Sequence, residues 1–70
     1  METIQIYGDY IQLDQLLKKL DLISSGGETG PFLAAHSISL NGQKVHEKRK
    51  KIRVGDELLI DGKAYAMKAE

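Results

Sequence analysis

Two tight-turn dipeptides set the strongest constraint on how this chain of 70 residues can fold. Asn41-Gly42 follows a short segment, residues 37–40, in which polar and apolar residues alternate, and Asp61-Gly62 lies between two short segments rich in apolar residues. Asn-Gly and Asp-Gly favour the two-residue turns of β-hairpins, because both turn positions need a positive φ angle. The sequence therefore predicts two hairpins, with strands over residues 37–40, 43–46, 57–60 and 63–67.

The first half of the chain carries one strand pattern and one helix pattern. Residues 2–7 alternate polar and apolar side chains, which is the period of a strand. In residues 10–23, the apolar positions follow the i, i+3, i+4, i+7 spacing of one helical face: Leu13, Leu16, Leu17 and Leu20. The segment Ser24-Ser25-Gly26-Gly27 is expected to end this helix.

A second, short helix is expected from about Pro31 to about His36, after an irregular turn over residues 26–30. Proline lacks an amide hydrogen and suits the first helical position, with Gly30 before it as a permissive cap. The element order is then β-α-α-β-β-β-β. This order predicts an α+β fold in which two short helices pack on one face of a small, mainly antiparallel sheet. Neither a linker nor an internal repeat divides the chain, so we expect a single domain over residues 1–70.

The positive charge of the chain is concentrated in one stretch. Overall, ten lysines and arginines balance ten aspartates and glutamates. Residues 41–54 nevertheless contain one acidic residue, Glu47, and six basic ones: Lys44, Lys48, Arg49, Lys50, Lys51 and Arg53. Adjacent cations repel one another unless they are solvated or meet an anion. The stretch therefore predicts a surface that contacts phosphate groups, and the alternative is a solvated loop.

Composition excludes several other classes. The sequence has no cysteine, which excludes disulfides and thiolate sites. No apolar run approaches the roughly 20 residues of a membrane span, and the start METIQIYGDY lacks a basic region followed by an apolar stretch. We expect a soluble protein of the cytoplasm.

Catalysis and metal binding are not indicated. His36 and His46 have no partners at the spacing of a metal site, and the carboxylates are scattered without a pair suited to acid–base chemistry. A chain of this size also encloses little volume for a substrate. We therefore expect no enzyme activity, no cofactor and no metal.

The ordered set of segments resembles the S4-type RNA-binding domain, also called the alpha-L motif. LDQLLKKLDLISSGG, a short helix, SISLNGQKV, a basic loop and IRVGDELLI follow one another as in that family. The likeness covers about residues 10–61, and it extends to the small stand-alone bacterial members known as YaaA. It implies that the two helices and the hairpin loops form a basic face that docks on structured RNA, either ribosomal or transfer RNA, including RNA within a ribosomal particle. Separately, we expect the protein to be a monomer.

Matched position by position, four segments fall on features of that family: the inter-helix turn Ser25-Gly26-Gly27, the hairpin turn Asn41-Gly42, the basic loop Lys48–Lys51 and the turn Gly55-Asp56. The candidate RNA-binding residues are Lys44, Lys48, Arg49, Lys50, Lys51 and Arg53, followed with weaker support by Lys18, Lys19, Ser25, Gly26 and Gly27. Gly30-Pro31 departs from the YaaA-type pattern, which has a small residue and then a lysine. The second helix is therefore expected to lack a positive charge and a turn, and residues 48–51 to carry more of the contact.

The glycine-rich segment Ser24-Ser25-Gly26-Gly27 has two interpretations. Its backbone N–H groups could face a phosphate at the start of the second helix. Alternatively, it is a simple connection between helices. Because no Gly-Lys-Ser/Thr follows the glycines, the segment does not indicate nucleotide hydrolysis.

Aromatic residues are few: Tyr7, Tyr10, Phe32 and Tyr65. Single-stranded RNA is usually read by stacking on aromatic rings, so their scarcity predicts recognition of backbone shape rather than of bases. Tyr10 is expected to open the first helix and to pack against the protein, and the alternative is a position at the surface. A rival interpretation is a protein–protein adaptor, in replication or repair assemblies, that uses the basic loop or the free edge of the last strand.

Overall fold

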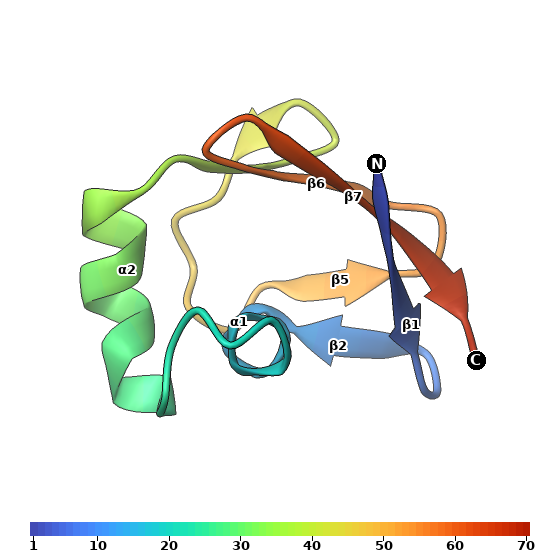
Figure 1. Ribbon diagram of the computed structural model, residues 1–70, viewed down its shortest axis with the longest axis horizontal. Coiled ribbons are helices and arrows are strands. Elements are labelled where there is room, and N and C mark those ends of the chain that lie inside the picture. The colour runs from blue at the N-terminus through green and yellow to red at the C-terminus, as the bar shows by residue number, and fades with distance from the viewer.

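The computed structural model describes residues 1–70, which form two helices, a short 3₁₀ turn and seven strands. Along the chain these elements are β1 (Glu2–Ile6), β2 (Tyr10–Gln12), α1 (Leu13–Lys19), η1 (Gly26–Glu28), α2 (Thr29–Ala35), β3 (Ile38–Leu40), β4 (Gln43–Lys44), β5 (Lys51–Arg53), β6 (Glu57–Ile60) and β7 (Lys63–Ala69). Figure 1 shows α2 standing at one end of the sheet and α1 lying beneath it. The predicted α+β class, with two short helices and a mainly antiparallel sheet, is confirmed.

Both predicted hairpin turns are present. Asn41 and Gly42 have φ angles of 51° and 85°, and Asp61 and Gly62 have φ angles of 50° and 86°. These positive values are those that a two-residue turn of the type I′ class needs. The turns join β3 to β4 and β6 to β7 as antiparallel pairs.

The main sheet has the strand order β1-β7-β6-β3-β4. β1 runs parallel to β7, with Ile4 opposite Met67, so the first and last strands lie side by side. β7 is therefore paired along both of its edges, with β1 on one and β6 on the other. The adaptor interpretation that relied on a free edge of the last strand is wrong in that respect, because the edges of this sheet are β1 and β4.

A second, two-stranded sheet pairs β2 with β5 and was not expected. Tyr10 lies opposite Arg53, and Ile11 lies opposite Ile52. The prediction that Tyr10 opens the first helix is wrong. α1 begins at Leu13, because the three preceding residues extend to pair with β5 and bring Ile11 against the fully buried Ile52.

α1 also ends earlier than expected. Asp21 adopts a positive φ of 62°, its amide donates to the carbonyl of Lys18, and the amide of Leu22 donates to the carbonyl of Leu17, each at 3.0 Å. This is the Schellman arrangement, which satisfies the last helical carbonyls. The chain therefore leaves the helix at residue 21, before the serines and glycines that were expected to stop it.

The second helical segment is longer than expected. η1 runs directly into α2, so Gly30 and Pro31 lie inside the helix rather than before it. Pro31 is the third residue of α2, still within the first turn, where a missing amide hydrogen costs no helical bond. The irregular turn predicted over residues 26–30 is thus mostly helical, and Gly30 is not a cap.

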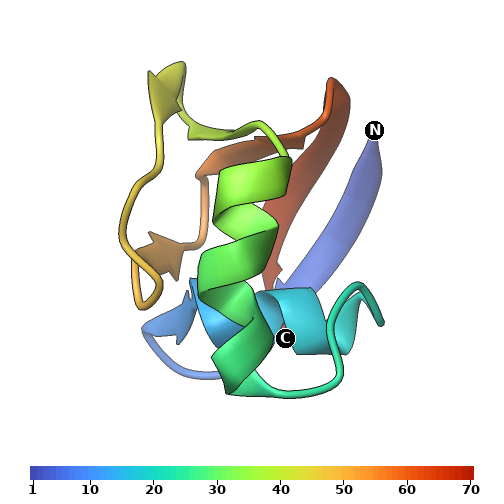
Figure 2. The ribbon, with the colours of Figure 1, turned by 90° about the vertical axis from the view of Figure 1, so that its left-hand side faces the viewer.

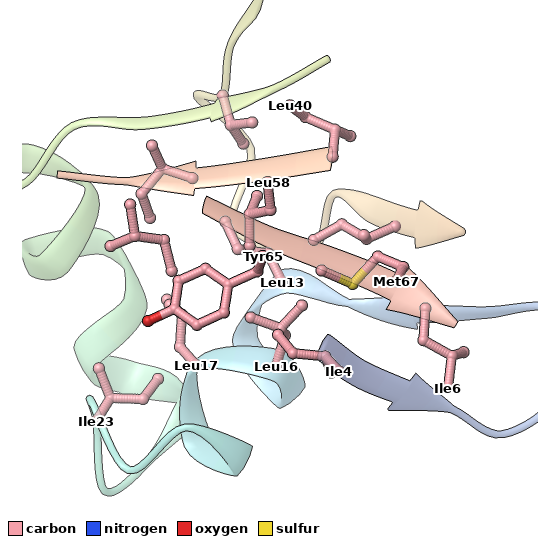
Figure 3. Packing of buried hydrophobic residues seen from close by; sticks show 14 residues of the cluster. Ile4, Ile6, Leu13, Leu16, Leu17, Ile23, Leu40, Leu58, Tyr65 and Met67 are labelled. Atoms are coloured by element: carbon pink, nitrogen blue, oxygen red, sulfur yellow. The ribbon is translucent and has the colours of Figure 1, made fainter. Parts of the chain in front are cut away.

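The core lies between the main sheet and α1. Figure 3 shows Leu13, Leu16 and Leu17 of α1 facing Tyr65 and Met67 of β7. All three leucines are fully buried, which confirms the helical face that their spacing predicted. Phe32 and Leu33 add part of α2 to this core. No helix of the protein has the length and apolar character needed to cross a membrane.

Candidate nucleic-acid interface

The basic run, residues 48–51, is held by two backbone hydrogen bonds. Lys50 donates its amide hydrogen to the carbonyl of Glu47 (3.3 Å), which closes a turn with Lys48 and Arg49 at its tip. The carbonyl of Lys50 accepts a hydrogen bond from the amide of Leu13 (2.9 Å). Lys51 is already the first residue of β5, so the predicted loop is shorter by one residue. The tip of the turn therefore projects from a fixed backbone.

Lys48 lies against α2. A Cβ built at Gly30 would be 3.2 Å from Cε and 3.7 Å from Nζ of Lys48, so the glycine leaves room for the lysine side chain. Figure 2 shows the segment between β4 and β5, in yellow, running beside α2. The departure at Gly30-Pro31 predicted a second helix without positive charge. The structure brings a positive charge to that helix from the neighbouring loop.

Lys51 and Arg53 both approach the ring of Tyr10. The Nζ atom of Lys51 is 4.9 Å from the ring centroid, and the Cζ atom of Arg53 is 5.7 Å from it. Because side chains alternate along a strand, these three residues share the outer face of the small sheet, while Ile52 points into the core. The small sheet therefore fixes two cations and an aromatic ring side by side.

The remaining predicted cations lie on other elements. Lys18 and Lys19 are exposed in the last turn of α1, and Lys19 donates to the carbonyl of Gln5 at 2.9 Å. Lys44 lies on β4, where it shares the lining of a hollow of about 390 Å³ with Lys50 and His46. The structure thus groups Lys48 with α2, Lys51 and Arg53 with Tyr10, and Lys44 with Lys50.

None of the eight predicted cations forms an ion pair. The protein has two ion pairs, His36 with Asp61 (2.6 Å) and Lys63 with Glu2 (2.7 Å). Several carboxylates instead accept hydrogen bonds from backbone amides, such as Asp56 from the amide of Arg53 at 2.8 Å. Several acidic residues therefore stabilise turns, while the eight predicted cations have no carboxylate partner.

The Ser25–Gly27 segment carries a carboxylate of its own. Oε2 of Glu28 accepts hydrogen bonds from the amides of Ser24 and Ser25, each at 2.8 Å. These backbone donors hold the pKa of Glu28 below its usual value. Both amides are engaged and a negative charge lies beside them, which favours the connection interpretation over the phosphate one. An RNA contact by Ser25, Gly26 or Gly27 stays a prediction.

This helix start could have been found in the sequence. Ser25-Gly26-Gly27-Glu28 has the Ser-x-x-Glu spacing of a capping box, in which the acidic side chain returns to the backbone amide of the first residue. The pattern indicates a helix beginning just after Ser25, as the structure has it. The two glycines drew attention to a turn instead.

Two exposed tyrosines are the functional candidates that sequence reasoning missed. Tyr7 is 67% exposed and Tyr10 is 38% exposed, although Tyr10 was expected to pack. The signal was the alternation in Tyr10-Ile11-Gln12, which places Ile11 inward and the other two outward once the segment is a strand. This strand signal was overlooked because the leucines with helical spacing begin at the next residue, Leu13.

The histidines have local contacts. Nδ1 of His36 is 2.6 Å from Oδ2 of Asp61, and its ring stacks on Phe32 with centroids 4.1 Å apart. This contact ties the end of α2 to the β6–β7 turn. The structure contains no cluster of three or more histidine and carboxylate side chains that could hold a metal ion.

Comparison with known proteins identifies the family of this chain. The family model described as the S4 domain matches residues 4–68. The probable ribosome maturation protein RlbA of Bacillus subtilis (strain 168) is 37% identical over 59 residues, which cover 84% of this chain and 83% of that relative. The residues that the family model matches include both helices, the basic run and the small sheet. The chain therefore belongs to the S4 domain family.

Proposed function

We propose that this protein is a non-catalytic RNA-binding protein of the cytoplasm that docks on structured RNA through a basic face centred on residues 48–51. The observation that carries the proposal is the group of eight exposed or half-exposed cations without a carboxylate partner. Lysines and arginines without a carboxylate partner are free to bind phosphates. This binding is favourable because it releases the counterions condensed on the nucleic acid. Membership of the S4 domain family supports RNA as the partner.

Ribosomal RNA is the favoured ligand within this proposal. The relative from Bacillus subtilis carries the description of a probable ribosome maturation protein, and the two chains match over most of their lengths. The cations of this face come from a turn, two strands and a helix, so they can meet phosphates at several positions along a folded RNA backbone. Transfer RNA is the second ligand to be compared.

The experiment compares a charge-removal variant with a matched control. Lys48→Ala/Arg49→Ala/Lys51→Ala removes three cations of the face and leaves Lys50, whose side chain is half-buried. Lys68→Ala removes an exposed, unpaired cation of β7 that is not among the predicted RNA-binding residues. Binding to ribosomal RNA fragments and to transfer RNA is measured by fluorescence anisotropy over a range of salt, with circular dichroism as the check on folding.

We expect the triple variant to lose most of its RNA affinity. The slope of log affinity against log salt should become less steep by roughly 0.7–0.9 for each phosphate contact removed. Lys68→Ala should bind as the parent does. Equal affinity of the triple variant and the parent would contradict the proposal. In a pull-down from lysate, partners that survive ribonuclease treatment would favour the protein adaptor instead.

A further inference from the structure

We propose a nucleobase-binding subsite beside the basic face, in the hollow between Tyr7 and Tyr10, where one unpaired base of the bound RNA stacks. The inference rests on the proposed function, because it assumes that the ligand is RNA. It goes beyond the proposed function by assigning a part of the protein that contacts a base rather than the phosphate backbone. None of the cations of the basic run is needed to form the hollow itself.

The hollow lies where the first strand, the second strand and the first helix meet. It has a volume of about 270 Å³ and is lined by Gln5, Tyr7, Tyr10, Ile11, Gln15 and Lys19. This is below the roughly 300–1,000 Å³ of pockets that enclose whole small molecules, which suits a single flat ring. Two tyrosines border it, and Tyr7 is 67% exposed without a packing role in the core.

Exposed aromatic rings of this kind have a use in binding. Removing the apolar surface of a tyrosine ring from water is favourable. A flat ligand that covers the two exposed rings would therefore gain binding free energy. Stacking of bases on aromatic rings is sequence-tolerant because every base has a π-face. Tyr7 and Tyr10 thus supply aromatic rings for stacking, and the basic run contains none.

Cations lie close to both of the tyrosines that border the hollow. Lys19 lines it and has its Nζ 5.3 Å from the ring centroid of Tyr7. Lys51 and Arg53 approach Tyr10 from β5, a strand that contributes no residue to the lining. A nucleotide whose base occupies the hollow would therefore have cations available for the phosphate on either side of it. This continuity with the basic face points to RNA as the occupant.

Polar groups at the rim match the edge of a base. Gln5 and Gln15 both line the hollow, and a glutamine amide carries a donor and an acceptor. Oε1 of Gln15 accepts from the amide of Gln12 at 3.4 Å, while its amide nitrogen has no partner within the protein. An added β-strand from a protein partner is disfavoured here, because Lys19 already occupies the carbonyl of Gln5 on the open edge of β1.

The test uses two RNA probes with the same stem. One is a hairpin with an unpaired loop that contains 2-aminopurine, whose fluorescence falls when it stacks, and the other is the blunt duplex. The variants are Tyr7→Leu and Tyr10→Leu, with Tyr7→Phe and Tyr10→Phe as controls that keep the ring. Tyr7 is so exposed that Tyr7→Leu keeps the test valid even if Tyr10→Leu lowers stability.

We expect the parent to prefer the hairpin and to quench 2-aminopurine. Each leucine variant should weaken hairpin binding by roughly five- to 100-fold, leave duplex binding and the salt slope unchanged, and lose the quenching. The phenylalanine variants should behave as the parent. If hairpin and duplex bind equally to all these proteins while Arg49→Ala weakens both, the subsite is refuted and the proposed function stands. Loss of affinity in the phenylalanine variants would also refute stacking, and failure of the parent to bind either RNA would refute both proposals.

Discussion

The carbonyl oxygen of Lys50 lies 2.9 Å from the amide nitrogen of Leu13, and this hydrogen bond joins the basic run to a fully buried residue. The charged turn and the core are therefore mechanically linked. Leu13 is also the first residue of α1, so the same position starts the helix, fills the core and anchors the turn. The geometry of the basic run depends on correct packing beneath it.

Truncation of Leu13 should accordingly be severe. Leu13→Ala removes a completely buried side chain, which typically lowers the free energy of unfolding by about 2–5 kcal/mol. A chain of this length has a total stability of roughly 4–10 kcal/mol, so much of it would be lost. Urea unfolding followed by circular dichroism measures the effect. Leu22→Ala is the matched control, because Leu22 is 41% exposed and should change stability by no more than about 0.5 kcal/mol.

Gly30 and Pro31 should be energetically coupled. Gly30 is helical and precedes a proline, and a Cβ at that position would meet the proline ring as well as Cε of Lys48 at 3.2 Å. Gly30→Ala is expected to lower the free energy of unfolding by about 1 kcal/mol. In the Pro31→Ala background the same change should be neutral or stabilising, because alanine then regains its helix propensity.

A double-mutant cycle of Gly30→Ala and Pro31→Ala, measured by urea unfolding, gives this coupling directly. Additive effects of the two substitutions would show that the proline does not select glycine at position 30. The second constraint on position 30 is the Lys48 side chain, which a Cβ there would displace. Comparing the RNA affinities of Gly30→Ala and Lys48→Ala tests this constraint. Similar losses are expected if the displaced lysine is the common cause.

Thr29 should tolerate loss of its hydroxyl. Its side chain is fully buried, and its Oγ1 has no hydrogen-bond partner. Thr29→Val replaces the unsatisfied hydroxyl with a methyl group of similar shape and should raise the free energy of unfolding by about 1 kcal/mol. Thr29→Ser keeps the hydroxyl but loses a buried methyl, so it should lower stability by a similar amount. Lower stability in the valine variant would mean that the hydroxyl has a partner in solution.

Stability should fall in acid partly through Asp61. The amide of Ser37 and the neighbouring His36 hold the pKa of Asp61 below its ordinary value of 3.8. The folded state thus favours the ionised form, and this contribution is complete above the ordinary pKa. It is lost as the pH falls through the lowered pKa of the folded state.

The measurement is the urea midpoint between about pH 6 and pH 2, compared with Asp61→Asn. Asparagine also adopts the positive φ of this turn, so the substitution mainly removes the charge. A flatter acid profile is expected for Asp61→Asn. Asp9→Asn, which removes a carboxylate that accepts no hydrogen bond, should retain the profile of the parent. Identical profiles for all three proteins would exclude Asp61 as a source of the pH dependence.

Local signals in the sequence were sufficient for the hairpins and for the buried face of α1. Asn41-Gly42 and Asp61-Gly62 determine their turns by backbone preference alone, and the leucine spacing follows from helix geometry. The pairing of Tyr10 with Arg53 could not be found in this way. It joins distant segments, and strand preference depends on the neighbour that a segment meets rather than on its own residues.

The candidate site likewise has one part that the sequence predicts and another that depends on the fold. The concentration of charge over residues 41–54 is a property of the sequence, and it identified the basic run directly. Side-chain neighbours are a property of the fold. Lys48 over Gly30 and Lys51 over Tyr10 depend on where the turn and the small sheet settle, and the exposed Tyr7 and Tyr10 follow from a strand that helical spacing concealed.

The parallel pairing of β1 with β7 bears on how the chain is made. Translation produces residues 2–6 well before residues 63–69, which form their only strand partner in the sheet. Until that last segment has left the ribosome, Ile4 and Ile6 have no strand beside them. The sheet therefore closes only after residues 63–69 have been made, and a product that stalls before residue 63 would expose these isoleucines to proteases and chaperones.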